Sequence, residues 1–252
     1  MAQGYLHSIE SMGLFDGPGI RTIFFLQGCP LRCVFCHNPD SQAFEQDKPI
    51  SPEEVLRQAN RYKPYYGKEG GVTFSGGEPL AQVDFLEEAL TLLKSEGFHT
   101  TVDTSGVANP REVARLLDKI DLFLLDVKAF NDEKFREIAG SSKKPLDLFM
   151  HMLQEEHYPG KIWIRHVMLP GVSDTEASMD DLLATIEPLR SWIERIEILP
   201  YHLMGVDKYK DLGRSYPLEG MPAMDQDKAK ALENYANHKF FSDEKKKQLA
   251  TA

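Results

Sequence analysis

The feature that most constrains the fold is a regular alternation of short apolar runs with helical patterns. The runs are rich in β-branched and aromatic residues and are bounded by glycine, proline or polar residues, which is typical of buried strands. Six such runs occur, at residues 21–26, 71–74, 99–103, 122–127, 162–169 and 196–199. Repeated strand and helix units predict a parallel sheet with helices outside it, either doubly wound or curved into a barrel.

The segments between these runs carry helix signals. Two helix starts combine a capping residue, proline at the first helical position and glutamate three residues after the cap. These are Ser51 with Pro52 and Glu54, and Asn109 with Pro110 and Glu112. A further helix has apolar residues spaced by three and four along one face, and Gly97 is placed to end it. Its apolar residues are Val83, Leu86, Leu90 and Leu93.

The strand ends distinguish the two architectures. In a barrel, functional residues collect where every strand ends, whereas in a doubly wound sheet only the loops at the switch point line the site. All six runs here lead into polar or glycine-rich segments: residues 27–40, 75–79, 103–106, 126–128, 169–171 and 199–202. We therefore predict an α/β fold that is a partial, open (β/α)6 barrel with parallel strands. We expect one domain over residues 1–241, followed by a polar tail at 242–252.

Charge and composition exclude several classes of protein. The chain has 29 Lys and Arg against 39 Asp and Glu, a formal net charge of −10, and an acidic surface repels nucleic acid and anionic lipid. The N-terminus shows no basic segment followed by an apolar run, and no stretch approaches the ~18 apolar residues of a membrane span. We expect a cytoplasmic protein that binds neither nucleic acid nor membrane.

All 3 cysteines of the 252 residues, Cys29, Cys33 and Cys36, fall within eight positions. In a reducing compartment this clustering indicates metal or redox chemistry rather than disulfides. A zinc site could recruit His37, but adjacent residues rarely both reach one tetrahedral ion. Ordinary ferredoxin clusters need four cysteines, so a four-iron cluster held here would keep one iron open to a small molecule.

The spacing C-x3-C-x2-C, with Phe35 just before the last cysteine, resembles the signature of the radical S-adenosylmethionine enzymes. The GGEP segment at residues 76–79 resembles a second motif of that family. The resemblance extends over nearly the whole chain to the members that activate glycyl-radical enzymes. It includes DGPGIR (16–21), SGGEPL (75–80), LDVK (125–128), WIR (163–165) and LPYH (199–202).

The resemblance implies a 4Fe–4S cluster on Cys29, Cys33 and Cys36, which would be the catalytic residues and the metal ligands. It also implies S-adenosylmethionine as cofactor, with Gly76 and Gly77 admitting its methionine moiety and Glu78 holding its ammonium group. The remaining cofactor contacts implied are Phe35, Cys36, His37, Asp126, Val127, Lys128, Arg165 and His202. Asp103 and Thr104 are the implied ligands of a monovalent cation.

In such enzymes an electron from the cluster cleaves S-adenosylmethionine to methionine and a 5′-deoxyadenosyl radical, which abstracts hydrogen from a glycine of a partner protein. The resemblance implies pyruvate formate-lyase as that partner, reduced flavodoxin or ferredoxin as electron donor, and a monomeric protein. The turn at residues 16–19 would lie near the substrate peptide. Two alternatives stay open: an activase of another glycyl-radical enzyme, and an iron–sulfur electron carrier.

Overall fold

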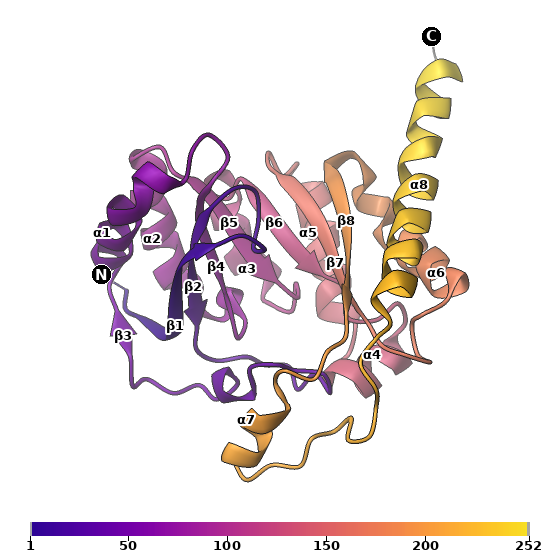
Figure 1. Ribbon diagram of the computed structural model, residues 1–252. Coiled ribbons are helices and arrows are strands. Elements are labelled where there is room, and N and C mark those ends of the chain that lie inside the picture. The colour runs from indigo at the N-terminus through magenta and orange to yellow at the C-terminus, as the bar shows by residue number, and fades with distance from the viewer. Residues whose placement is uncertain (1, 251–252) are drawn as a thin grey trace.

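The computed structural model describes residues 2–250, with side chains as far as Ser242, and contains one eight-stranded sheet. The strand order is β3-β1-β2-β4-β5-β6-β7-β8. The six predicted runs are β2 (Arg21–Leu26), β4 (Gly71–Gly76), β5 (His99–Thr104), β6 (Leu122–Asp126), β7 (Lys161–Met168) and β8 (Ile193–Pro200). They pair in parallel in chain order, and because β3 and β8 are separate edges the barrel is open, as predicted (Figure 1).

Two strands were not predicted: β1 (Gly4–Gly13) and β3 (Pro49–Ile50). Strand β1 pairs antiparallel with β2, and its register shifts twice along the pairing. Eight of its ten residues are partly buried or exposed, so it lacks the apolar run of a central strand, and its irregular register removes a clean alternation. Strand β3 is a two-residue pairing with β1 that no pattern could reveal.

Helices follow the strands as the alternation requires. They are α1 (Pro52–Tyr62), α2 (Val83–Ser95), α3 (Pro110–Val113), α4 (Asp132–Ala139), α5 (Lys144–Glu155), α6 (Glu176–Ile186), α7 (Val206–Asp211) and α8 (Gln226–Ala250). Short 3-10 helices are η1 (Pro39–Ser41), η2 (Lys63–Tyr65), η3 (Pro79–Gln82), η4 (Ala114–Lys119) and η5 (Glu187–Trp192). The predicted caps are confirmed, because Ser51 accepts a hydrogen bond from the Glu54 amide and Asn109 from the Arg111 amide.

Helix α8 passes through Ser242, the residue at which the sequence analysis placed the start of the tail. Its Ala236 and Phe240 are buried, and its last turns extend beyond the sheet (Figure 1). Residues 251 and 252 of the expected tail lie outside the described residues, and the division at 241 stays a prediction. No helix in the described part of the chain is long and apolar enough to cross a membrane.

Arg21 holds the later part of the connection from β1 to β2. Arg21 is fully buried and donates to the Pro18 carbonyl at 3.0 Å and to the Thr73 hydroxyl at 2.6 Å. The Thr73 hydroxyl in turn donates to the Asp16 carbonyl at 2.7 Å. Gly17 has φ of +120°, which favours glycine, and a Cβ there would meet Arg21 at 3.0 Å. This connection therefore carries Asp16 toward the strand ends.

Candidate active site

A cavity of about 290 Å³ lies at the carboxyl ends of the strands, where the barrel architecture predicts the site. It brings together twelve of the fifteen predicted site residues. These are Cys29, Cys33, Phe35, Cys36, His37, Gly76, Gly77, Glu78, Asp103, Thr104, Asp126 and Lys128. Four consecutive strand ends, those of β2, β4, β5 and β6, thus contribute to one cavity.

The cysteine loop, defined here as residues 27–42, is held at both ends by backbone hydrogen bonds. At its ends the Gly28 amide donates to the Ser41 carbonyl at 2.8 Å and the Cys29 amide to the Gln42 carbonyl at 3.1 Å. In its middle the Arg32 and Val34 amides donate to carbonyls at the end of α4, each at 2.9 Å. The loop is therefore fixed although it contains no regular strand or helix apart from η1.

The three cysteines are free thiols that are partly exposed to the cavity. Burial raises the pKa of Cys29 to about 11 and that of Cys33 to about 12, so these thiols are protonated at neutral pH in the free protein. No group of three His, Cys, Asp or Glu side chains among the described residues surrounds one point as the ligands of a single metal ion would.

The two glycines of the GGEP segment are required by the packing of neighbouring strand ends. Gly76 has φ of +114°, and a Cβ there would lie 2.3 Å from the Leu26 amide nitrogen. A Cβ on Gly77 would lie 2.2 Å from the Gly28 carbonyl oxygen. Both distances are too short for any side chain. We explained these glycines by the room that a cofactor needs. The fold gives a further explanation, because the neighbouring backbone leaves no space for a side chain at either position.

Glu78 is buried, with 1% of its surface exposed, and its carboxylate accepts four hydrogen bonds from the protein. The donors are the Thr104 hydroxyl at 2.6 Å, the Ser105 amide at 2.9 Å, the Ser105 hydroxyl at 2.6 Å and the Leu80 amide at 3.2 Å. Burial raises the pKa of Glu78, and these bonds oppose that rise. Glu78 therefore joins the loops after β4 and β5, and its contact with an ammonium group stays a prediction.

Asp126 and Lys128 form an ion pair at the end of β6, and both side chains are 14% exposed. The Lys128 ammonium lies 5.4 Å from the centre of the Phe35 ring in the cysteine loop. Burial lowers the pKa of Lys128, but the Asp126 carboxylate outweighs this effect and the pKa is raised overall. Oδ1 of Asp126 is buried and has no hydrogen-bond partner among the described residues, so an acceptor at the cavity is left unsatisfied.

Arg165 lies beside this cavity rather than in its lining, held among carboxylates. Its Nε donates to Glu197 of β8 at 2.9 Å, and its Nη1 lies 3.6 Å from Asp16 and 3.9 Å from Asp103. It also donates to the Phe15 carbonyl. Burial, together with the Asp103 carboxylate, raises the pKa of Asp16 to about 6, although Arg165 opposes this. Arg165 thus joins the β1–β2 connection to β7 and β8.

Val127 and His202 also lie outside the cavity lining. Val127 is fully buried in the core. The His202 ring stacks on the His37 ring with 3.8 Å between centroids, and the His37 Nε2 donates to the His202 carbonyl at 2.9 Å. His202 therefore supports His37, and its direct contact with a cofactor stays a prediction.

Several lining residues were missed by the sequence analysis as site residues: Asp16, Phe25, Leu31, Asn38, Ser75, Ser105, Val167 and Leu199. Asp16 lay within a segment that we read chiefly as a turn. Ser75 and Ser105 directly adjoin predicted site residues, and the Ser75 hydroxyl donates to Asp103 at 2.7 Å. Position next to a motif was the signal that could have identified them.

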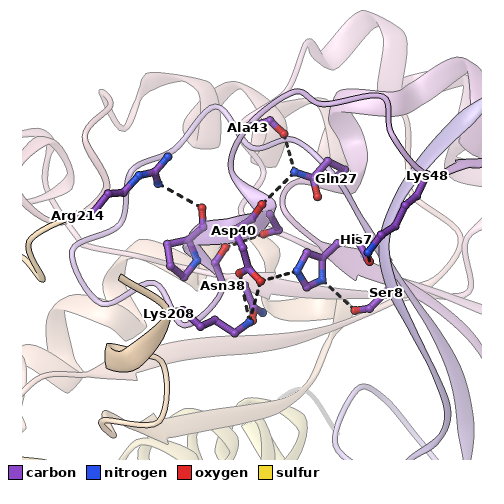
Figure 2. A network of polar contacts seen from close by, with 11 residues as sticks. His7, Ser8, Gln27, Asn38, Asp40, Ala43, Lys48, Lys208 and Arg214 are labelled. Carbon is purple, nitrogen blue, oxygen red and sulfur yellow. Dashed lines mark hydrogen bonds and ion pairs between the residues drawn. The ribbon is translucent and has the colours of Figure 1, made fainter. Parts of the chain in front are cut away.

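A polar network fixes the end of the cysteine loop (Figure 2). His7 of β1 lies 2.8 Å from an Asp40 carboxylate oxygen, and Lys208 of α7 donates to Asn38 at 2.8 Å and to Asp40 at 3.2 Å. Arg214 donates to the Pro39 carbonyl at 3.3 Å. Burial would raise the pKa of Asp40, but the hydrogen bonds from His7 and Lys208 lower it overall. Segments distant in sequence thus converge on one side of the site.

Comparison with known proteins agrees with this fold. The Radical SAM superfamily pattern matches residues 23–183. Among solved structures, Streptococcus suis SuiB bound to precursor peptide SuiA superposes with a TM-score of 0.64 at 17% identity, over 88% of this chain and 46% of that one. A radical SAM methyltransferase from Sphaerobacter thermophilus has a TM-score of 0.63 at 16% identity, over 86% of this chain and 63% of that one. These structures share the fold.

Two curated relatives are similar over nearly their whole length. The pyruvate formate-lyase-activating enzyme of Clostridium pasteurianum is 44% identical over 93% of this chain and 98% of its own. The enzyme of that name from Staphylococcus aureus (strain USA300) is 43% identical over 95% of this chain and 97% of its own. The chain therefore belongs to the radical SAM superfamily and, within it, to the family of pyruvate formate-lyase-activating enzymes.

Proposed function

We propose that this chain activates pyruvate formate-lyase by generating a glycyl radical in that enzyme. The observation that carries the proposal is that all three thiols of the chain line one cavity together with the GGEP and DVK segments. The similarity to pyruvate formate-lyase-activating enzymes over nearly the whole chain supports the choice of partner. A 4Fe–4S cluster and S-adenosylmethionine would supply an electron and, by cleavage of the sulfonium, a 5′-deoxyadenosyl radical that abstracts the glycine α-hydrogen.

The residues present fit these two groups. The only cysteines of the chain, Cys29, Cys33 and Cys36, line the same cavity, and a cluster held by three thiolates takes one of them on each of three irons. The buried and unsatisfied Asp126 Oδ1 is an acceptor that suits a ligand hydroxyl group. Aromatic and cationic groups, Phe35 and Lys128, stand beside it.

The roles of the side chains follow from their positions. Phe35, Cys36 and His37 would border the adenine, with His202 supporting His37, while Asp126 and Lys128 would orient the ribose and the carboxylate. The backbone of Gly76 and Gly77 would border the methionine moiety, and Glu78, whose carboxylate orders that loop, would hold the ammonium group. Asp103 and Thr104 would face a monovalent cation, although the Thr104 hydroxyl already donates to Glu78. Arg165 would keep its ion pairs with the neighbouring carboxylates of Asp16, Asp103 and Glu197.

The substrate glycine would arrive on an extended loop of pyruvate formate-lyase, because the further polar lining residues Asn38, Ser75 and Ser105 already bond to protein groups. Asp16 reaches the cavity from the β1–β2 connection and would meet that loop. We further propose that reduced flavodoxin or ferredoxin supplies the electron, that the protein is a cytoplasmic monomer, and that residues 1–241 form its single domain. A loop that leaves its own fold to bind should bind better as part of the whole partner than as a short peptide.

The decisive experiment uses anaerobically reconstituted protein, S-adenosylmethionine, dithionite and pyruvate formate-lyase deuterated at its glycines. We expect about four irons per chain, methionine, 5′-deoxyadenosine that carries deuterium, and a glycyl radical signal in the partner. Replacing Cys29, Cys33 or Cys36 by alanine should abolish all of the products. An electron carrier would yield no 5′-deoxyadenosine, and an activase of another enzyme would yield it without deuterium or a radical in this partner.

A further inference from the structure

His166 is a buried histidine for which the proposed reaction has no role so far. It follows Arg165 on β7, and because neighbouring residues of a strand face opposite sides, His166 faces the helices while Arg165 faces the barrel interior. Its side chain is buried, with 2% of the residue exposed. Its Nδ1 lies 2.7 Å from the carbonyl oxygen of Val127.

The tautomer of this ring follows from its partner. Burial lowers the pKa of His166, so the ring is neutral at neutral pH and carries one proton. A carbonyl oxygen can only accept, so the proton is on Nδ1 and the bond is Nδ1–H to the Val127 oxygen. The other nitrogen, Nε2, is buried without a hydrogen-bond partner among the described residues.

Val127 lies between Asp126 and Lys128, the two residues whose side chains form an ion pair at the catalytic cavity. The regular pairing of β6 with β7 ends at Asp126, which lies opposite Arg165. The Val127 amide still donates to the Arg165 carbonyl at 2.8 Å, so β7 holds both polar groups of Val127, one by backbone and one by the His166 ring. Because the peptide unit is planar, fixing this carbonyl also fixes the nitrogen and Cα of Lys128.

Part of the surroundings of the His166 ring is a cavity. His166 borders a second cavity of about 180 Å³ behind the catalytic one, between the β6–α4 loop, α4, the β7–α6 loop and α6. The Phe130 ring contacts His166 with 4.9 Å between centroids, and the cavity leaves other parts of its surroundings open. A ring beside a cavity keeps its orientation through its hydrogen bond.

We propose that His166 is a positioning residue, whose Nδ1–H holds the Val127 carbonyl and thereby sets the direction in which Lys128 projects into the catalytic cavity and pairs with Asp126. This inference rests on the proposed function, because the two side chains act there on S-adenosylmethionine. His166 itself touches neither the cavity of the thiols nor the groups bound in it. Its effect should therefore appear in cofactor binding and leave the iron content unchanged.

The test compares two variants that separate hydrogen bonding from packing. His166→Leu keeps much of the volume and removes the donor, whereas His166→Asn keeps a donor at the position of Nδ1 and loses volume. Loss of the bond should raise the KM for S-adenosylmethionine about fivefold in His166→Leu, with normal iron content, while His166→Asn stays within about twofold of the parent. Ile164→Ala, on the same face of β7, is the control for lost packing and should lower the Tm with the KM unchanged.

A second measurement does not depend on activity. In 15N-histidine-labelled protein without cluster, nuclear magnetic resonance should show His166 protonated on Nδ1 and bare on Nε2. Protonation on Nε2, or an unchanged KM in His166→Leu, or equal impairment of the Leu and Asn variants, would overturn the inference. If the parent protein makes no 5′-deoxyadenosine, the proposed function fails instead, and the spectrum still reports separately whether the His166 bond exists.

Discussion

At the scale of single residues, the GGEP segment shows that a motif can be required by the fold before any ligand binds. The Gly77 amide donates to Leu26 at 2.8 Å, and a Cβ on Gly77 would overlap the Gly28 carbonyl. Gly28 directly precedes Cys29, so the end of β4 and the start of the cysteine loop are in contact. Any side chain at Gly77 must therefore displace the segment that carries the first thiol.

We predict that Gly77→Ala lowers both stability and iron content. The clash of a Cβ only 2.2 Å from a backbone oxygen cannot be relieved by a rotamer change, and the free energy of unfolding should fall by about 3 kcal/mol. Urea denaturation and iron per chain after reconstitution measure the two effects. Gly97→Ala is the control, since a Cβ there meets nothing within 4 Å and its φ of +74° costs only about 1 kcal/mol. Normal iron content in Gly77→Ala would contradict the prediction.

His99 should make the folded protein sensitive to acid. Burial and the neighbouring Arg21 lower the pKa of His99 from 6.5 to about 4. The unfolded chain therefore binds this proton first as the pH falls, and stability is lost between about pH 6.5 and 4, by on the order of 3 kcal/mol. In His99→Gln this part of the loss should be absent when urea denaturation is followed against pH. Parallel pH curves for parent and variant would refute the assignment.

At the scale of elements, the sequence predicted the features that depend on residues close together in the chain. The caps at Ser51 and Asn109 and the buried face of α2 are confirmed, because each depends on residues within one or two turns. The helix after Asn109 is shorter than its start suggested, since α3 ends at Val113 and continues as η4. Strand β1 and the contacts of Glu78 were beyond prediction, because they depend on partners far along the chain.

Helix α7 is another element whose role depends on contacts with residues far away in the sequence. Its Lys208 reaches Asn38 and Asp40 across 170 and 168 positions of sequence (Figure 2). In Figure 1, α7 lies at the end of the sheet where the strands enter their loops. No pattern within residues 206–211 indicated that they brace the cysteine loop.

We predict that Lys208→Ala loosens the end of the cysteine loop. Lys208 is 38% exposed and Asp40 33%, so the lost stability should be only about 1 kcal/mol. The clearer effect should be faster amide hydrogen exchange at residues 38–42, measured by mass spectrometry. Lys210→Ala is the matched control, because Lys210 is 75% exposed and pairs with Asp207 on its own helix. Equal exchange in the two variants would show that α7 does not brace the loop.

At the scale of the whole molecule, the barrel is open, and the edges of its sheet are β3 and β8. The β1–β2 connection contacts the last two strands, β7 and β8, and so links them to the start of the chain. Arg165 is the contact that makes this link, through Asp16 on one side and Glu197 on the other. The order of the parallel strands could be predicted from their alternation with helices. The path of the connection could not, because it depends on a buried cluster of charges that only the folded chain assembles.

The last prediction tests this link by removing its cation. In Arg165→Met the carboxylates of Asp16, Asp103 and Glu197 lose their shared partner, and an unpaired buried charge typically costs about 3–5 kcal/mol. Arg165 lowers the pKa of Asp16, so without the arginine this pKa rises further in the folded state, and the folded protein takes up this proton before the unfolded chain does as the pH falls. The deficit relative to the parent should therefore be largest at pH 7 and shrink toward pH 5 in urea denaturation. Arg195→Met is the control, since Arg195 contacts the same Glu197 but is 56% exposed and should cost little at either pH. A deficit in Arg165→Met that does not change with pH would mean that lost packing, rather than unpaired carboxylates, explains the role of Arg165.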